Sequence, residues 1–151
     1  MIIICISCNS GSVYSSFVSI KDSWKEADKI DFTFNAPDSV KTYDLFIYVR
    51  NDENYNFSNL FLIVDMNFPN GNRVVDTLQY EMAAPDGTWL GNGFTSLKES
   101  KLWYKEKIKF PANGEYNVQI QHAMRINGRV EGIKALEGIK DVGFGIEAAT
   151  N

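Results

Sequence analysis

The chain is poor in the residues that build disulfide and metal centres. Its 151 residues include two cysteines, Cys5 and Cys8, and a single histidine, His122. A disulfide between positions three apart would brace no core, so the sequence excludes a disulfide scaffold. Two thiols leave two ligand positions of a tetrahedral zinc ion empty, and one histidine excludes a multi-histidine site within one chain. We therefore expect no metal ion and no cofactor.

Cations are not in excess either, and catalytic motifs are missing. Lys and Arg number 15 against 19 Asp and Glu, a formal net charge of −4. Because proteins that bind phosphate backbones cluster cations, this balance argues against a nucleic-acid partner. The sequence shows no phosphate-binding loop and no nucleophile beside a base. We expect a protein that is not an enzyme, with His122 either structural or solvated.

What the sequence does contain is the material for one folded domain. Hydrophobic residues make up 44% and charged residues 23% of the chain, which excludes general disorder. Aromatic residues reach 13% and favour strands. The length suits one domain with a sizeable core, and no repeat or linker divides it.

Alternation of apolar and polar residues predicts strands along most of the chain, most clearly at 115–122. Residues 43–49 are apolar on both faces, which predicts a central strand. Residues 60–66 are similar apart from Asp65, and an Asn-Gly turn follows within 68–72. We expect these segments to form a long antiparallel hairpin pair.

The stretch from Arg73 to Met124 organises the predicted fold, with turns at 85–87 and 111–114 between its strands. Residues 130–139 are expected to form one or two helical turns, before a last strand around Phe144. About eight strands with almost no helix predict an all-β fold. Its natural form is a two-sheet antiparallel β-sandwich, jelly-roll or immunoglobulin-like.

The amino terminus has the character of a lipoprotein signal. Residues 1–8 are an apolar run that ends in Ser7-Cys8, and a polar spacer follows. The run is shorter than the roughly 20 apolar residues that span a bilayer, and it lacks a basic leader. We expect residues 1–12 to be a signal remnant and tether with Cys8 lipidated, and 13–151 to be the sandwich domain. The alternative is a buried first strand with free thiols.

Several polar groups are candidates for chemistry, but a structural role is favoured for each. Asp65 and Asp76 are candidates for a carboxylate pair. The loop residues Asp52, Glu53 and Asn54 are candidates for a calcium site. The lysines of 101–109 suit an acidic partner, although lysine on an edge strand also prevents aggregation without any partner.

Loop aromatics and two arginines form the candidate binding surface. Aromatic rings exposed in loops stack on sugars, whereas buried rings plug the ends of a sandwich, and both interpretations stay open. The rings concerned are those of Tyr55, Phe57, Trp89 and Phe94. We take Arg50, Tyr55, Trp89 and Arg125 as the candidate surface, with carbohydrate as one ligand class.

Eight ordered segments are distinctive when they are taken together with their spacing, although each alone is weakly specific. They are Tyr43–Asn51, Tyr55–Leu60, Phe68–Gly71, Asp76–Leu78, Asp86–Gly91, Gly114–Tyr116, His122–Arg125 and Leu136–Gly143. In their order and spacing these segments resemble the GldH gliding-motility lipoproteins of the Bacteroidetes, over almost the whole chain.

The resemblance implies a non-enzymatic outer-membrane lipoprotein with Cys8 as the lipidated residue. It also implies protein partners in the machinery that moves surface adhesins and is linked to type IX secretion. The residues after Cys8 lack the acidic cluster associated with surface export, which favours the periplasmic side. We expect a scaffold or accessory protein tethered to the membrane; a carbohydrate-binding module is the alternative.

Overall fold

The computed structural model describes residues 12–91, 93, 97–125 and 130–149, and this part of the chain is all-β. It contains ten strands, two of which have only two residues. The strands are β1 (Ser12–Ser19), β2 (Trp24–Lys25), β3 (Ile30–Asn35), β4 (Tyr43–Asn51), β5 (Asn59–Asn67), β6 (Arg73–Glu81), β7 (Lys98–Ile108), β8 (Glu115–His122), β9 (Ala135–Leu136) and β10 (Ile139–Ala148).

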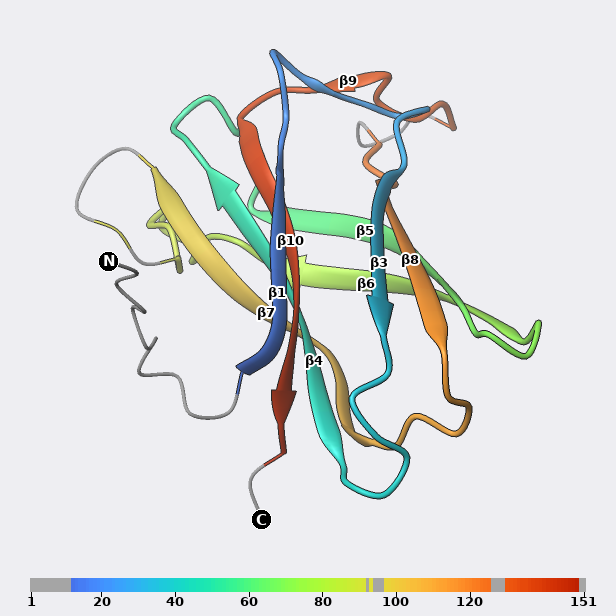
Figure 1. The fold of residues 1–151 in the computed structure, drawn as a ribbon. Helices are drawn as coiled ribbons and strands as arrows, with labels where there is room; N and C mark the ends of the chain where they lie inside the picture. Colours follow the sequence, from blue (N-terminus) through green and yellow to red (C-terminus); the bar gives the residue numbers. More distant parts are fainter. Residues whose placement is uncertain (1–11, 92, 94–96, 126–129, 150–151) are drawn as a thin grey trace, which may run out of the picture.

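Two four-stranded antiparallel sheets form the domain, as predicted (Figure 1). The first sheet has the order β1-β10-β4-β7, and the second has the order β3-β8-β5-β6. The short strands β2 and β9 pair with each other at one end of the domain. Neighbours within each sheet are mostly distant in sequence, so the chain crosses repeatedly between the sheets.

The core lies between the two sheets and is lined by every second residue of their central strands. Leu45, Ile47 and Val49 of β4 are fully buried, and so are Val118 and Ile120 of β8. Burying such a side chain contributes about 1.5–3 kcal/mol. The central position of β4, predicted from its two apolar faces, is confirmed.

The predicted pairing of 43–49 with 60–66 is wrong, because β4 and β5 belong to different sheets. Strand β4 already pairs with β10 on one edge and with β7 on the other, which leaves no edge for β5. The turn at 68–72 does make a hairpin, between β5 and β6. Gly71 there has φ +88°, which glycine adopts without strain.

The helical turns predicted within 130–139 are also wrong. Strand β9 lies in this segment, and the described residues contain no helix. Gly138 has φ +92° and lies directly against the backbone of Tyr55, so the segment follows an extended path with a turn. The stretch Arg73–Met124, which was expected to organise the fold, contains two edge strands, β6 and β7, and one central strand, β8.

The amino-terminal predictions concern residues outside the described part of the chain. Strand β1 begins at Ser12, and Cys8 and the alternative first strand lie before the described residues. Within the described ranges, no helix has the length and apolar character needed to cross a membrane.

Candidate functional site

The outer face of the sheet β1-β10-β4-β7 carries aromatic side chains from three strands. The strand register places Gly145, Phe46 and Trp103 in one row across the sheet. The next row holds Phe17, Gly143, Tyr48 and Lys101. We call the four rings of Phe17, Phe46, Tyr48 and Trp103 the aromatic face.

Two glycines of β10 leave the space that two of these rings occupy. A Cβ atom at Gly143 would lie 2.7 Å from the Phe17 ring, and one at Gly145 would lie 2.6 Å from the Tyr48 ring. Neither glycine has a positive φ, so the missing side chain, rather than backbone freedom, explains its place. The Phe17 and Tyr48 rings therefore lie over the backbone of β10.

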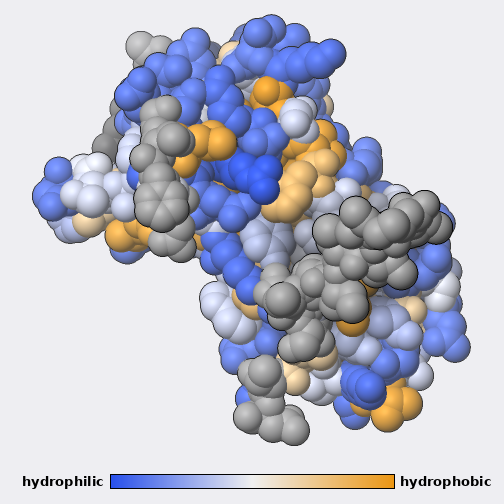
Figure 2. All heavy atoms as spheres, turned by 60° about the vertical axis from the view of Figure 1, so that its left-hand side comes forward, coloured by the Kyte–Doolittle hydropathy of each residue, from blue (hydrophilic) through white to orange (hydrophobic). Residues whose placement is uncertain are grey.

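The four rings form one connected surface with a buried base and an exposed tip. Phe17 and Tyr48 have ring centroids 5.4 Å apart, and those of Phe46 and Trp103 are 4.5 Å apart. Phe46 is only 4% exposed, whereas Trp103 is 54% exposed. Figure 2 shows the flank that includes β7, where apolar side chains form small patches among hydrophilic ones. Trp103 is thus a large ring presented to solvent on a packed base.

Charged side chains border the aromatic face and contact it. The Lys101 ammonium lies 4.2 Å from the centroid of the Phe46 ring and 2.6 Å from the Glu147 carboxylate. The Arg50 guanidinium lies 4.1 Å from the centroid of the Phe17 ring and 3.0 Å from Glu99. Cations over ring faces are stabilised by the ring quadrupole.

The Tyr48 hydroxyl also contacts a charged side chain at the edge of the aromatic face. It donates a hydrogen bond of 3.3 Å to Glu147. Burial, together with the Glu147 charge, raises the pKa of Tyr48 to about 12. The hydroxyl therefore stays protonated at neutral pH and remains a donor. The face therefore presents flat apolar rings edged by hydrogen-bond donors and acceptors.

The sequence-predicted surface residues do not come together on one exposed patch. Arg50 borders the aromatic face, whereas Arg125 is exposed and forms an isolated β-bridge with Gly132. Tyr55 is 2% exposed, and its hydroxyl donates to the Asn59 carbonyl. Trp89 is half-buried, with its ring centroid 6.1 Å from that of Tyr55.

Tyr55 is therefore part of the core, and the half-buried Trp89 packs against it. Phe57 packs against Tyr55 as well, with ring centroids 5.7 Å apart. Phe94 lies outside the described residues.

The candidate carboxylate pair is separated by the sheet. Val64 pairs with Asp76 and Asp65 pairs with Val75, so the two carboxylates point to opposite faces. Asp65 accepts from Arg73 at 2.6–2.9 Å, which lowers its pKa. Asp76 forms an ion pair of 2.9 Å with Lys105. This geometry cannot place both carboxylates on one substrate.

Asp52 of the candidate calcium site and His122 also have structural partners. Asp52 accepts from the Asn54 amide at 2.9 Å and lies 3.4 Å from Lys140. His122 is buried, with Nε2 3.0 Å from the Trp24 carbonyl oxygen and Nδ1 3.3 Å from the Met124 amide. Among the described residues, no three His, Cys, Asp or Glu side chains are grouped as metal ligands.

Sequence reasoning missed the aromatic face, although two signals pointed to it. Phe46 and Tyr48 are the outward-facing apolar residues of a strand that is apolar on both faces. Gly143 and Gly145 alternate with the core residues of β10, where small residues leave room for neighbours.

The structure defines a β-sandwich domain with aromatic rings on the outer face of one sheet, and comparison with known proteins shows the family. The GldH lipoprotein family model matches residues 12–146. The chain is 51% identical over 150 residues to the gliding motility lipoprotein GldH homolog of Christiangramia forsetii, covering 99% of this chain and 92% of the relative. This chain belongs to the GldH lipoprotein family.

A second relative matches nearly the same part of the chain. The chain is 48% identical over 145 residues to the gliding motility lipoprotein GldH of Flavobacterium johnsoniae, covering 96% of this chain and 90% of the relative. The resemblance seen in the ordered sequence segments is confirmed.

Among solved structures, dimeric latent PorU of Porphyromonas gingivalis aligns with a TM-score of 0.38 and 9% identity, over 92% of this chain and 13% of that one. The VP2 subviral particle of infectious bursal disease virus aligns with a TM-score of 0.35 and 12% identity, over 90% of this chain and 34% of that one.

Proposed function

We propose that this protein is a non-enzymatic lipoprotein of the outer membrane that holds a protein partner through its aromatic face. The partner belongs to the gliding motility or type IX secretion-linked machinery. Membership of the GldH lipoprotein family supports a role in motility, because both relatives are named gliding motility lipoproteins. Cys8 carries the acyl chains, and the domain faces the periplasm.

The observation that carries the docking role is the exposed Trp103 ring on its packed aromatic base. Protein interfaces are enriched in Trp, Tyr and Arg, and their strongest contacts are aromatic anchors surrounded by a polar rim. Trp103 has the base of Phe46 beneath it and the Lys101–Glu147 pair beside it. An aromatic or aliphatic side chain of the protein partner packs on this preformed surface.

The test is a crosslinked pull-down from detergent-solubilised membranes of cells that carry tagged variants. Trp103→Ala is compared with Val75→Ala, because Val75 is also an exposed apolar residue (51%) but lies on the other sheet. We expect motility or secretion components to be recovered with wild type and Val75→Ala, and to be lost with Trp103→Ala. Equal recovery with all three proteins would contradict docking at this face.

A carbohydrate ligand is the alternative, and the exposure of Trp103 is the observation that favours it. Sugars stack on exposed indole rings, and Trp24 is buried while Trp89 is half-buried. Glycans should then quench the fluorescence of wild type, and quenching should disappear in Trp103→Phe. Quenching without recovery of any motility component would favour the carbohydrate role over the docking role.

A further inference from the structure

Strand β6 ends the sheet β3-β8-β5-β6, and among the described strands it pairs with β5 alone. At the two ends of their ladder, the Met82 amide donates to the Ser58 carbonyl at 2.7 Å and the Phe68 amide donates to the Asn72 carbonyl at 2.8 Å. Because hydrogen-bonded and non-hydrogen-bonded pairs alternate, the even-numbered residues of β6 bond to β5. The odd-numbered residues direct their N–H and C=O groups away from the sheet. They are Arg73, Val75, Thr77, Gln79 and Glu81.

The free edge of β6 lacks the features that protect the other edge strands. Strand β7 contains four lysines and two shifts of register, and β1 has a shift near its start. Strand β3 has only six residues. Strand β6 contains neither lysine nor proline, and its nine residues pair with β5 without a shift. A long and regular edge of this kind is a template for pairing with another strand.

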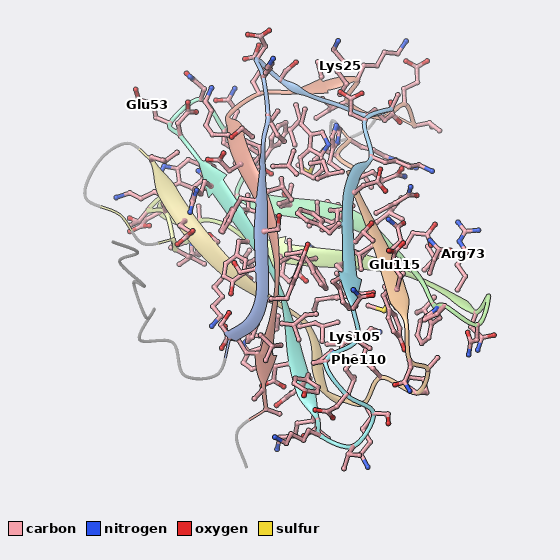
Figure 3. All side chains as sticks on the ribbon, in the orientation of Figure 1. Lys25, Glu53, Arg73, Lys105, Phe110 and Glu115 are labelled. Atoms are coloured by element: carbon pink, nitrogen blue, oxygen red, sulfur yellow. The ribbon has the colours of Figure 1, made fainter. Side chains whose placement is uncertain are left out.

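This edge is also open to solvent. Val74 and Val75 are 37% and 51% exposed. The tip of the β5–β6 hairpin lies at the margin of the molecule (Figure 1), and the Arg73 side chain points outward from it (Figure 3). The contacts of β6 with β7 use the side chains of Asp76 and Tyr80. They therefore leave the outward N–H and C=O groups of the strand available.

A second copy of the same strand fits this edge best in one register. In antiparallel pairing about a two-fold axis, outward residues must face outward residues. With Thr77 on the axis, the whole strand is paired and Thr77 faces its own counterpart. Arg73 then faces Glu81 of the second copy, and threonine pairs and opposite charges stabilise neighbouring strands. A displacement by two residues in either direction leaves strand ends unpaired and separates these two charges.

The charges near the edge balance in that register. Asp65 engages the Nε and Nη2 atoms of Arg73, whose side chain is still 60% exposed, so Nη1 is left for a second carboxylate. Glu81 is exposed and, among the described residues, belongs to no ion pair within the chain. Three cations therefore accompany three carboxylates in each copy: Lys29, Arg73 and Lys105 with Asp65, Asp76 and Glu81.

We propose that a second copy of this chain pairs with β6 in this register and joins the two β3-β8-β5-β6 sheets into one continuous sheet. Main-chain hydrogen bonds supply the affinity, and the side-chain pairs fix the register. The aromatic face lies on the other sheet, so it stays available in both copies. Position 75 contacts only the second copy of this chain, and it therefore remains a control for docking of a different protein.

The test places one cysteine on β6 of the full chain, in a Cys5→Ser, Cys8→Ser background, and oxidises the protein in dilute solution. In Thr77→Cys the two Cα atoms face each other about 5.5 Å apart, which a disulfide spans. In the matched control Gln79→Cys they lie about 13 Å apart along the strands. We expect several-fold more disulfide-linked dimer from Thr77→Cys. Equal yields from the two variants would overturn the register.

Sedimentation equilibrium of the reduced wild-type chain tests association without an added cysteine. We expect a concentration-dependent dimer that Glu81→Arg weakens several-fold, because an arginine then faces Arg73 of the second copy. Glu115→Arg makes the same change of charge on the central strand β8 and should leave the dimer unchanged. A wild-type chain that stays monomeric at every concentration would overturn the proposal and leave the edge to an extended segment of another protein.

Discussion

The Tyr80 hydroxyl donates a hydrogen bond of 2.6 Å to the main-chain carbonyl oxygen of Trp103. Tyr80 lies on β6 and Trp103 on β7, so this bond joins the edge strands of the two sheets. The Asp76–Lys105 ion pair spans the same edge at 2.9 Å. The position of β7, and with it the Trp103 ring, therefore depends on contacts from the opposite sheet.

Replacing Tyr80 by Phe should loosen this edge while it preserves the ring. A hydrogen bond of this kind contributes about 1 kcal/mol, so urea unfolding should show a loss of that order. Gln79→Ala, an exposed change on the same strand, is the control and should be nearly neutral. Equal stability of Tyr80→Phe and wild type would show that the bond does not hold the sheets together.

Gly145→Ala should destabilise the domain through the Tyr48 ring. The new Cβ atom would lie 2.6 Å from that ring, and such overpacking typically costs about 1–3 kcal/mol. In a Tyr48→Ala background the same change should cost much less, because the obstructing ring is gone. A double-mutant cycle from urea unfolding measures this coupling. Additive effects would contradict the proposed reason for the glycine.

The Asp65–Arg73 pair should make stability depend on pH in the acid range. Arg73 lowers the pKa of Asp65 in the folded state, so the pair's contribution is fully present above the unfolded pKa of about 3.9. It is lost as the pH falls through the lower, folded-state pKa. We expect the unfolding free energy of wild type to fall more steeply below about pH 4 than that of Asp65→Asn. Parallel curves would contradict the pair's role.

His122 should contribute a second pH dependence near neutrality. Burial lowers its pKa from 6.5, so the folded state prefers the neutral ring. Stability is therefore fully present above pH 6.5 and falls as the pH drops below 6.5 toward the folded-state pKa. Between pH 6.5 and the folded-state pKa, the unfolding free energy should decline as the pH falls in wild type and should stay flatter in His122→Gln. An equal slope in both proteins would contradict a buried neutral histidine.

The strands were predictable where local patterns are strong. The alternation at 115–122 and the two apolar faces of 43–49 each correspond to a central strand. Which strands become neighbours was not predictable, because pairing depends on edges that β10 and β7 occupy from far along the chain. The pattern of 43–49 indicates a buried strand but does not indicate which sheet this strand joins.

The candidate site was harder to predict for a related reason. Tyr55 follows a polar loop, yet the close approach of Gly138 and the Asp52 turn draw its ring into the core. The aromatic face takes its rings from β1, β4 and β7, and its spaces from β10. No local window contains that combination, so only the sheet register reveals it.

The most direct test of the account is photo-crosslinking in living cells at position 103. A photoreactive phenylalanine analogue replaces Trp103, and the same analogue at Val75 serves as the matched control on the other sheet. The account predicts crosslinks from position 103, but not from position 75, to a component of the motility or secretion machinery. Crosslinks to such a component from position 75 alone would contradict docking at the aromatic face.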